Sequence, residues 1–180
     1  MIEGLFDKTT IKAALTAVAT RLKSQDAHTH VLVIVGGSFM ALSDLRNSTQ
    51  DVDTLTRLTA TLRNAVSDVA IEYGYEPDWL NDHAAAYLPQ GLREQDCTLL
   101  AEYPSLRVLG PPPNFVFIMK LYAARGEVDH SDMVRLWPIC NFTSVADAID
   151  LYWSAYPHAP DDEHLATYVD QIAREATTSM

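Results

Sequence analysis

A short apolar strand that ends at a glycine doublet is the feature that most constrains the fold of this chain. Residues 30–35, HVLVIV, are β-branched or apolar at nearly every position, which is typical of a central strand buried on both faces. Gly36 and Gly37 follow as the only adjacent glycines in the sequence, and residues 38–42 predict a short helix directly after them. A central strand needs partner strands, so the chain is expected to contain a sheet as well as helices.

The other hydrophobic patterns divide the chain into two parts. Apolar residues at helical spacing predict helices over about 10–23, capped by Thr9 or Thr10, and over 58–73, while 51–56, 97–102 and 106–109 have the pattern of strands. Residues 77–82 suggest a turn into a short helix that ends at 89–91. After the run GPPP at 110–113 every pattern is helical, at 114–126, 131–137, 143–156 and 161–176. We therefore predict an α/β (α+β) core over residues 1–110 and a helical region over 111–180.

Charge and composition exclude several classes of protein. The chain carries 24 acidic and 13 basic residues, and the resulting net charge of −11 disfavours nonspecific binding to nucleic acid. Its longest apolar run, at 115–119, is far shorter than the ~20 residues that span a bilayer, and the acidic N-terminus is unlike a signal peptide. Cys97 and Cys140 are too isolated for a zinc ribbon or a disulfide framework. A cytoplasmic protein with reduced thiols is expected.

Gly36, Gly37 and Ser38 form a candidate phosphate-binding turn. Glycines let the backbone approach a triphosphate closely, and the Ser38 hydroxyl and nearby amides can donate hydrogen bonds to its oxygens. The alternative interpretation is that the doublet only makes a tight turn from strand to helix.

Asp51 and Asp53 form a candidate metal site. They are two residues apart on a predicted strand, so both side chains point to one face while Val52 points to the core. Paired carboxylates suit Mg²⁺, which neutralises phosphate charge. The alternative is a solvated strand edge with no role in chemistry.

Lys120 is the most informative single residue. Its neighbours one helical turn away are all apolar: Val116, Phe117, Ala123 and Ala124. A lysine in such a face either meets an anion or extends along its own stem into solvent. Asp129 and Asp132 follow, and they are candidates either for the site or for the N-cap and third residue of the next helix.

Taken together, these segments resemble the nucleotidyltransferases of the DNA polymerase beta-like superfamily. The signature of that superfamily is Gly-Ser, a gap of about a dozen residues and then D-x-D, which is matched by VGGSFMAL at 35–42 and RNSTQDVD at 46–53. The later segments VFIMKLYAAR at 116–125 and DHSDMVRL at 129–136 resemble the minimal bacterial branch that includes the AbiEii and MenT toxins. In that branch a helical lysine and a following aspartate complete the site.

The resemblance implies a nucleotidyltransferase-like mixed sheet flanked by helices, a C-terminal helical bundle, and transfer of a nucleoside monophosphate from a nucleoside triphosphate. By position, the resemblance implies phosphate ligands at Gly36, Gly37, Ser38 and Arg46, and Mg²⁺ ligands at Asp51 and Asp53. It also assigns roles to Lys120 and Asp132. In this assignment Lys120 would contact the triphosphate, and Asp132 would either support this contact or act as a base.

Larger members of the superfamily carry a third metal-binding carboxylate, for which Glu102 and Asp82 are the candidates here. The resemblance further implies an RNA acceptor, in particular tRNA, or a protein acceptor, and a toxin with a cognate antitoxin as partner. The competing hypothesis is a non-catalytic module on the same fold that binds a nucleotide or a partner protein.

Overall fold

The computed structural model describes residues 6–25, 28–123 and 126–178 of the chain. Two compact units are distinguished by their internal contacts. The first comprises residues 1–88 and 97–111, and the second comprises 89–96 and 112–180. Each unit is described by itself below, and the short segment 89–96 belongs with the helical unit although it precedes two strands of the first.

The first unit is built on a mixed five-stranded sheet in the order β5-β4-β2-β7-β6. Its strands are β2 (His30–Val35), β4 (Val52–Thr54), β5 (Leu80–Asn81), β6 (Thr98–Tyr103) and β7 (Leu106–Gly110). Strand β2 is central as predicted, and it pairs parallel to β7 and antiparallel to β4. A second, two-stranded sheet joins β1 (Phe6–Asp7) to β3 (Ser48–Thr49).

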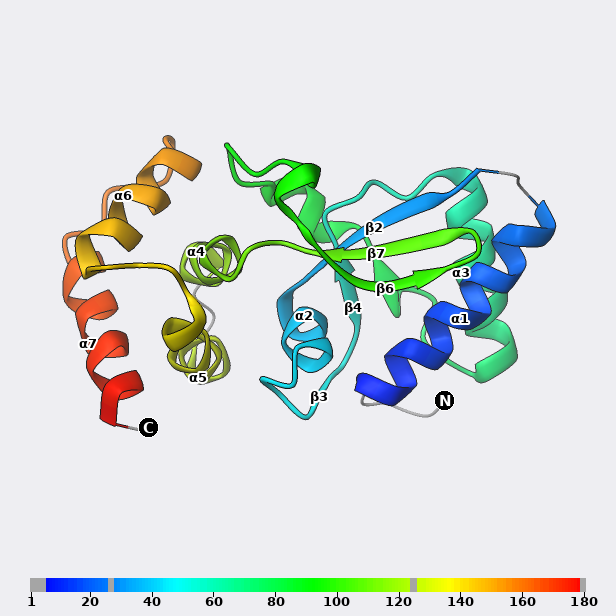
Figure 1. Cartoon of the computed structure of the whole chain (residues 1–180), viewed down its shortest axis with the longest axis horizontal. Coiled ribbons are helices and arrows are strands. Elements are labelled where there is room, and N and C mark those ends of the chain that lie inside the picture. The colour runs from blue at the N-terminus through cyan, green and yellow to red at the C-terminus, as the bar shows by residue number, and fades with distance from the viewer. Residues whose placement is uncertain (1–5, 26–27, 124–125, 179–180) are drawn as a thin grey trace. The chain divides into compact units, whose positions relative to one another are not determined.

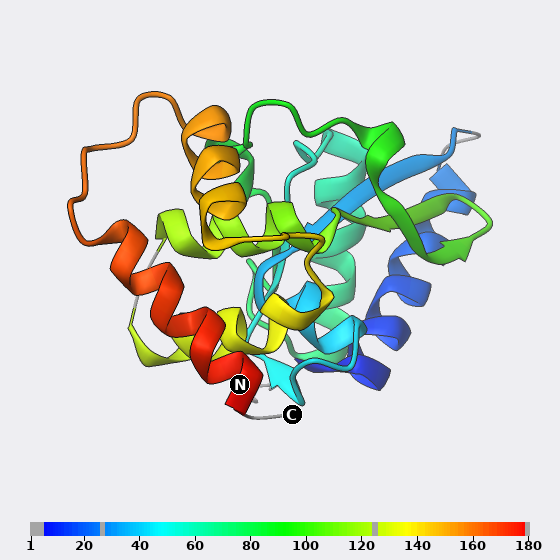
Figure 2. The same ribbon diagram turned by 60° about the vertical axis from the view of Figure 1, so that its left-hand side comes forward.

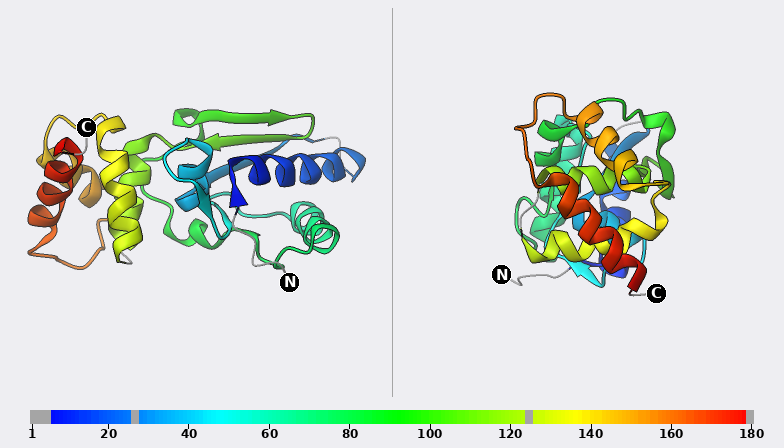
Figure 3. Two further views of the ribbon diagram at one scale, coloured as in Figure 1. Left: turned by 90° about the horizontal axis from the view of Figure 1, so that it is seen from below. Right: turned by 90° about the vertical axis from the view of Figure 1, so that its left-hand side faces the viewer.

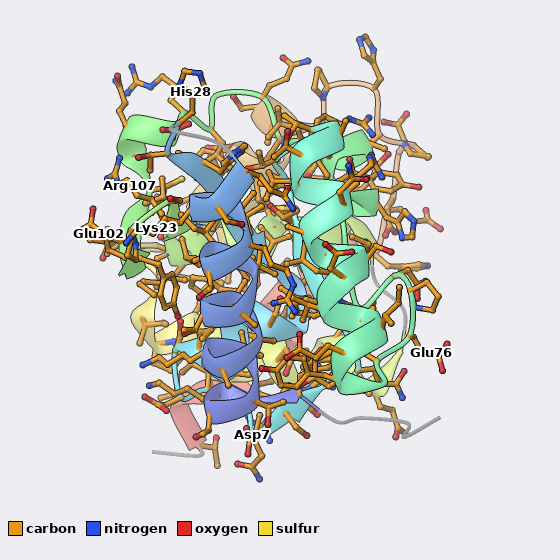
Figure 4. The ribbon with its side chains drawn as sticks, turned by 90° about the vertical axis from the view of Figure 1, so that its right-hand side faces the viewer. Asp7, Lys23, His28, Glu76, Glu102 and Arg107 are labelled. Carbon is orange, nitrogen blue, oxygen red and sulfur yellow. The ribbon has the colours of Figure 1, made fainter. Side chains whose placement is uncertain are left out.

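Three helices complete this unit: α1 (Lys8–Gln25), α2 (Gly36–Leu42) and α3 (Ala60–Tyr73). Figure 1 shows the arrangement of the elements, and in Figure 4 α1 and α3 lie side by side in front of the sheet. Helix α1 buries the predicted apolar stripe, including Ile11, Leu15 and Leu22. The predicted caps of α1 are wrong, because Thr9 and Thr10 lie inside the helix and the Asp7 carboxylate accepts from the Thr10 amide at 2.7 Å.

The segment 77–82 was predicted as a turn into a short helix and instead contains strand β5. The Val52 amide donates to the Trp79 carbonyl at 2.6 Å, which starts parallel pairing between β4 and β5. Trp79 is buried, stacks on Phe6, and donates from its indole nitrogen to the Val66 carbonyl at 3.2 Å. Burial of this one aromatic ring therefore places the two-residue strand. Short 3-10 helices follow at His83–Tyr87 and Glu94–Asp96.

The second unit contains the four helices predicted after residue 113. They are α4 (Pro113–Ala123), α5 (Glu127–Leu136), α6 (Val145–Ala155) and α7 (Leu165–Thr178), with a 3-10 turn at Trp137–Ile139; Figure 3 shows them from two sides. Ser144 and Asp147 form a capping box that starts α6. The fold class is confirmed: a mixed sheet flanked by helices precedes a C-terminal helical bundle.

Two expectations from composition can also be compared with the structure. Within the described ranges, none of the helices has both the length and the apolar character that a membrane span requires. Cys97 and Cys140 do not form a disulfide, and burial raises the pKa of the Cys140 thiol to about 12. Cys140 is therefore an unreactive thiol at neutral pH.

Candidate functional site

The predicted site residues fall into two groups, one in each unit. The first unit holds the glycine turn (Gly36 and Gly37) with Ser38, Arg46, and the two metal-binding candidates Asp51 and Asp53. The second unit holds Lys120 and Asp132. Within each unit the structure brings its own group together. That both groups act on one triphosphate, as the resemblance implies, stays a prediction.

The glycine doublet is a point of close approach as well as a turn. It forms the first residues of α2, directly after β2 (Figure 2). Gly36 has a φ of +62°, and a Cβ atom there would lie 3.0 Å from the Asp53 carboxylate oxygen Oδ2. A Cβ atom on Gly37 would collide with Thr49 Oγ1 and lie 3.1 Å from Arg46 Nη1. The doublet thus lets a carboxylate and a guanidinium pack against the backbone, which a simple turn does not require.

Ser38 connects the glycine turn to strand β4, which is called the aspartate strand below because it carries Asp53. Its side chain is fully buried, and its hydroxyl donates to the Val35 carbonyl at 2.8 Å. The same oxygen accepts from the Asp53 amide at 3.3 Å. Because the only proton of the hydroxyl is already donated, Ser38 here positions Asp53 instead of presenting a donor to a phosphate.

Antiparallel pairing brings Asp53 to the glycine turn. Asp53 lies opposite Val35 in the register of β2 and β4, and Val35 is the residue before Gly36. Val52 is fully buried, as the predicted alternation requires. Strand β4 has neighbours on both sides, so the alternative of a solvated strand edge is wrong.

Asp51 immediately precedes β4 and lies in a crowded electrostatic environment. Burial and the neighbouring charge of Asp78 raise the pKa of Asp51, while a hydrogen bond with the Asn81 side chain opposes part of this increase. Asn81 is itself buried, lies opposite Asp53 in β5, and accepts from the His83 amide at 3.1 Å. Sequence reasoning missed Asn81 and Asp78, because only the unexpected strand β5 brings them to the two aspartates.

Neither candidate for the third carboxylate lies where a metal ligand is needed. Asp82 is buried and accepts from the Leu58 amide at 2.9 Å and from Arg63 Nη2 at 2.8 Å. These contacts, the Leu58 amide foremost, hold the pKa of Asp82 below its usual range. Asp82 therefore fixes the chain before α3.

Glu102 is remote from the aspartates. It lies on β6, which is three strands from β4 in the sheet, about 14 Å at the usual spacing. Its carboxylate faces Arg107 at 3.7 Å, and both residues lie near the C-terminal end of α1, while Asp7 marks the other end (Figure 4). Neither Glu102 nor Asp82 completes the pair of aspartates.

The Lys120 ammonium is buried in the second unit between two carboxylates. Its side chain is 8% exposed, and Nζ lies 3.0 Å from Asp129 Oδ1 and 2.8 Å from Asp132 Oδ2. The alternative in which Lys120 extends into solvent is therefore wrong. Helices α4 and α5 lie side by side (Figure 1), which brings the lysine of one against the acids of the other.

Asp129 and Asp132 do not form the cap and third residue of α5 that sequence reasoning offered as an alternative. The cap is Gly126, without a side-chain hydrogen bond, so Asp129 is the third helical residue and Asp132 lies in the body of the helix. Asp132 is 1% exposed, and its second oxygen lies 3.8 Å from Arg135 Nη1. Both aspartates are therefore partners of Lys120.

The donors at β4 suit one mode of magnesium binding. Over residues 6–25, 28–123 and 126–178, no group of three or more His, Cys, Asp and Glu side chains forms a prepared metal site. Mg²⁺ is commonly held by only one or two carboxylates together with substrate phosphates. Asp51 and Asp53 fit this mode, since Asp51 is near the like charge of Asp78, and a cation would relieve that repulsion.

Comparison with known proteins identifies a family for the chain. No curated protein and no solved structure matches the chain. A model of the family described as "Nucleotidyltransferase of unknown function (DUF6036)" matches residues 12–150, which include the glycine turn, both strand aspartates, Lys120 and Asp132. The chain therefore belongs to this family of nucleotidyltransferases.

Proposed function

We propose that this protein is an Mg²⁺-dependent nucleotidyltransferase that moves a nucleoside monophosphate from a nucleoside triphosphate to an RNA or protein acceptor. The observation that carries the proposal is the approach of the Asp53 carboxylate to the Gly36 backbone, where a Cβ atom would lie only 3.0 Å away. This approach joins a backbone turn that accommodates phosphate to a carboxylate that accommodates a metal.

Asp51 and Asp53 would hold the magnesium ion together with oxygens of the triphosphate. When bound, the ion neutralises phosphate charge and makes the phosphorus more electrophilic. Arg46, whose guanidinium lies against Gly37, would supply a second positive charge beside the turn. Ser38 contributes by holding the Asp53 amide, and so strand β4, which carries Asp53 and directly follows Asp51.

The transfer balances without any further reactant. A hydroxyl oxygen of the acceptor forms a bond to the α-phosphorus, the bond between the α-phosphorus and the bridging oxygen breaks, and pyrophosphate leaves. The proton of the hydroxyl passes to solvent or to a base. Asp132 is poorly suited to be that base, because it is buried and paired with Lys120. We assign Asp132 to support Lys120, which contacts the triphosphate.

The acceptor and the biological role are part of the proposal. The segments around Lys120 and Asp132 resemble the AbiEii and MenT branch, which favours tRNA as the acceptor and a toxin restrained by a cognate antitoxin in the cytoplasm. The net charge of −11 favours an acceptor that is recognised locally over one bound through a broad basic surface.

The direct test is transfer of label. The purified chain is incubated with each α-³²P-labelled nucleoside triphosphate, total tRNA and Mg²⁺, and parallel samples contain EDTA or the Asp53→Asn variant. We expect label in the RNA or in the protein only when Mg²⁺ and Asp53 are both present. Absence of transfer with all four nucleotides and both acceptor classes would contradict the proposal.

One observation favours a second candidate, the non-catalytic nucleotide-binding module. Asp82 and Glu102 are both engaged away from the two aspartates, so a third carboxylate is not identified among the described residues. A thermal shift separates the candidates, because a ligand at 100 times its dissociation constant stabilises a protein by about 2.7 kcal/mol. A shift with a triphosphate but no transfer of label identifies the binding module.

A further inference from the structure

The two carboxylates on Lys120 are not equivalent. Asp132 is 1% exposed and lies in the body of α5, where Met133 and Leu136 are also buried. Asp129 is 18% exposed and lies in the first turn of the same helix. Moving Asp132 away from Lys120 would leave a buried charge unpaired, which is costly, whereas Asp129 can rotate toward water.

An anion cannot approach Lys120 favourably while both contacts are in place. The ammonium has three N–H donors, and carboxylate oxygens lie at 2.8 and 3.0 Å from its nitrogen. One lysine and two aspartates carry a formal charge of −1, so they repel a phosphate at short range. Arg135 offsets this only in part, because its nearest nitrogen is 3.8 Å from Asp132 and its side chain is half exposed.

We propose that Asp129 is a displaceable carboxylate that occupies the phosphate position on Lys120 until a triphosphate replaces it. This inference rests on the proposed function, because it assumes that Lys120 contacts the triphosphate. Asp132 stays in place and holds the ammonium, while Asp129 leaves and its bond is replaced by one to a phosphate oxygen. Asp129 thereby sets the affinity for the nucleotide and is a regulatory position in the site.

The sequence offers a matched control in the same helical turn. Glu127 is exposed, lies two residues before Asp129 and, in the described part of the chain, makes no ion pair with Lys120. Glu127→Gln removes one negative charge from the first turn of α5, as Asp129→Asn does, but it removes no ligand of the lysine. The difference in triphosphate affinity between the two variants separates competition by Asp129 for Lys120 from the effect of a general change of charge.

The experiment is a calorimetric titration of Mg²⁺-bound inorganic triphosphate into the full chain and four variants. Asp129→Asn is expected to bind about 10-fold more tightly, since one charge-assisted contact no longer competes. Glu127→Gln should change affinity only about 2-fold, and Asp129→Glu, which restores the charge, should return affinity toward that of the unaltered chain. Lys120→Gln, which keeps a donor for Asp132, should lose affinity.

The outcomes separate this inference from the proposed function. If Lys120→Gln loses affinity while Asp129→Asn gains no more than Glu127→Gln, Lys120 is a triphosphate ligand and the competition by Asp129 is wrong. If Lys120→Gln binds as tightly as the unaltered chain, Lys120 is not a ligand, and both this inference and its role in the proposed function are overturned. Melting temperatures of each variant without ligand verify that every titrated protein is folded.

Discussion

The two units treat charge in opposite ways. In the first unit, Asp51 lies just before the interior strand β4 and Asp53 lies on it. Burial and the nearby charge of Asp78 raise the pKa of Asp51. In the second unit, the buried Lys120 is matched by two aspartates within 3.0 Å. In the first region, carboxylates lie near one another and a cation would relieve their repulsion. In the second region, the cation already has carboxylate partners, one of which can be exchanged. From this comparison we expect the first region to bind metal by addition and the second to bind phosphate by substitution of a carboxylate.

The largest expected effect tests the region around Asp51 and Asp53. Asp53→Asn removes one of two metal ligands, so we expect metal-dependent transfer to fall about a thousandfold or more, which corresponds to ~4 kcal/mol of transition-state stabilisation. Steady-state transfer of labelled nucleotide measures the loss, and circular dichroism checks that the fold is kept. A folded variant with unchanged activity would show that the aspartate strand has no part in the chemistry.

The region around Lys120 is tested through stability. Asp132→Ala leaves the buried Lys120 without its most enclosed partner, which is expected to cost about 3–5 kcal/mol. Asp129→Ala is the matched control and should cost about 1 kcal/mol or less, because its carboxylate is partly exposed. Urea denaturation compares the two free energies of unfolding. Equal costs would mean that the two aspartates are equivalent, contrary to their difference in burial.

A third variant tests the contact between the glycine turn and the aspartate strand. Gly36→Ala places a methyl group at a φ of +62° and 3.0 Å from Asp53 Oδ2. We expect a loss of about 1–2 kcal/mol in stability from backbone strain, together with weaker binding of Mg²⁺ as Asp53 is displaced. Gly74→Ala is the control, since Gly74 also has a positive φ but nothing lies within 4 Å of its added Cβ. If both variants bind Mg²⁺ equally well, the approach of Asp53 to Gly36 does not matter for the metal.

The smallest effect concerns pH. Because the pKa of Asp51 is raised in the folded protein, the stability linked to its proton is present below the ordinary value of 3.8 and is lost as pH rises through the folded pKa. Asp51→Asn should therefore melt slightly higher than the unaltered chain at pH 7, at about 2–4 °C per kcal/mol gained, and the difference should vanish near pH 3.5. A lower melting temperature at pH 7 would indicate that Asp51 makes a stabilising contact that outweighs its burial.

Much of the fold follows from local patterns in the sequence. The six residues of β2 and the apolar stripes of the helices are visible because each is long enough to show its period. Strand β5 was missed because two residues cannot show alternation. The cap of α1 was assigned to a threonine because nothing local indicates that Asp7 is the residue that turns back onto the helix.

The site was only partly predictable for the same reason. The glycine doublet and the paired aspartates are local motifs, but their connection through Ser38 depends on the pairing of β2 with β4. The sequence shows that Lys120 lies on an apolar face, whereas its carboxylate partners come from the next helix. The sequence alone suggests that Lys120→Met is stable. Its pairing with the buried Asp132 predicts that this substitution destabilises the protein.

The Ser38 hydroxyl also provides a way to observe the site without a substrate. It is an acceptor for the Asp53 amide at 3.3 Å, so exchange of that amide proton with deuterated solvent requires this bond to open. Because the hydroxyl is buried and also bonded to Val35, opening must separate the start of α2 from β4. The exchange rate of a single backbone proton therefore reports how often the glycine turn and the aspartate strand come apart.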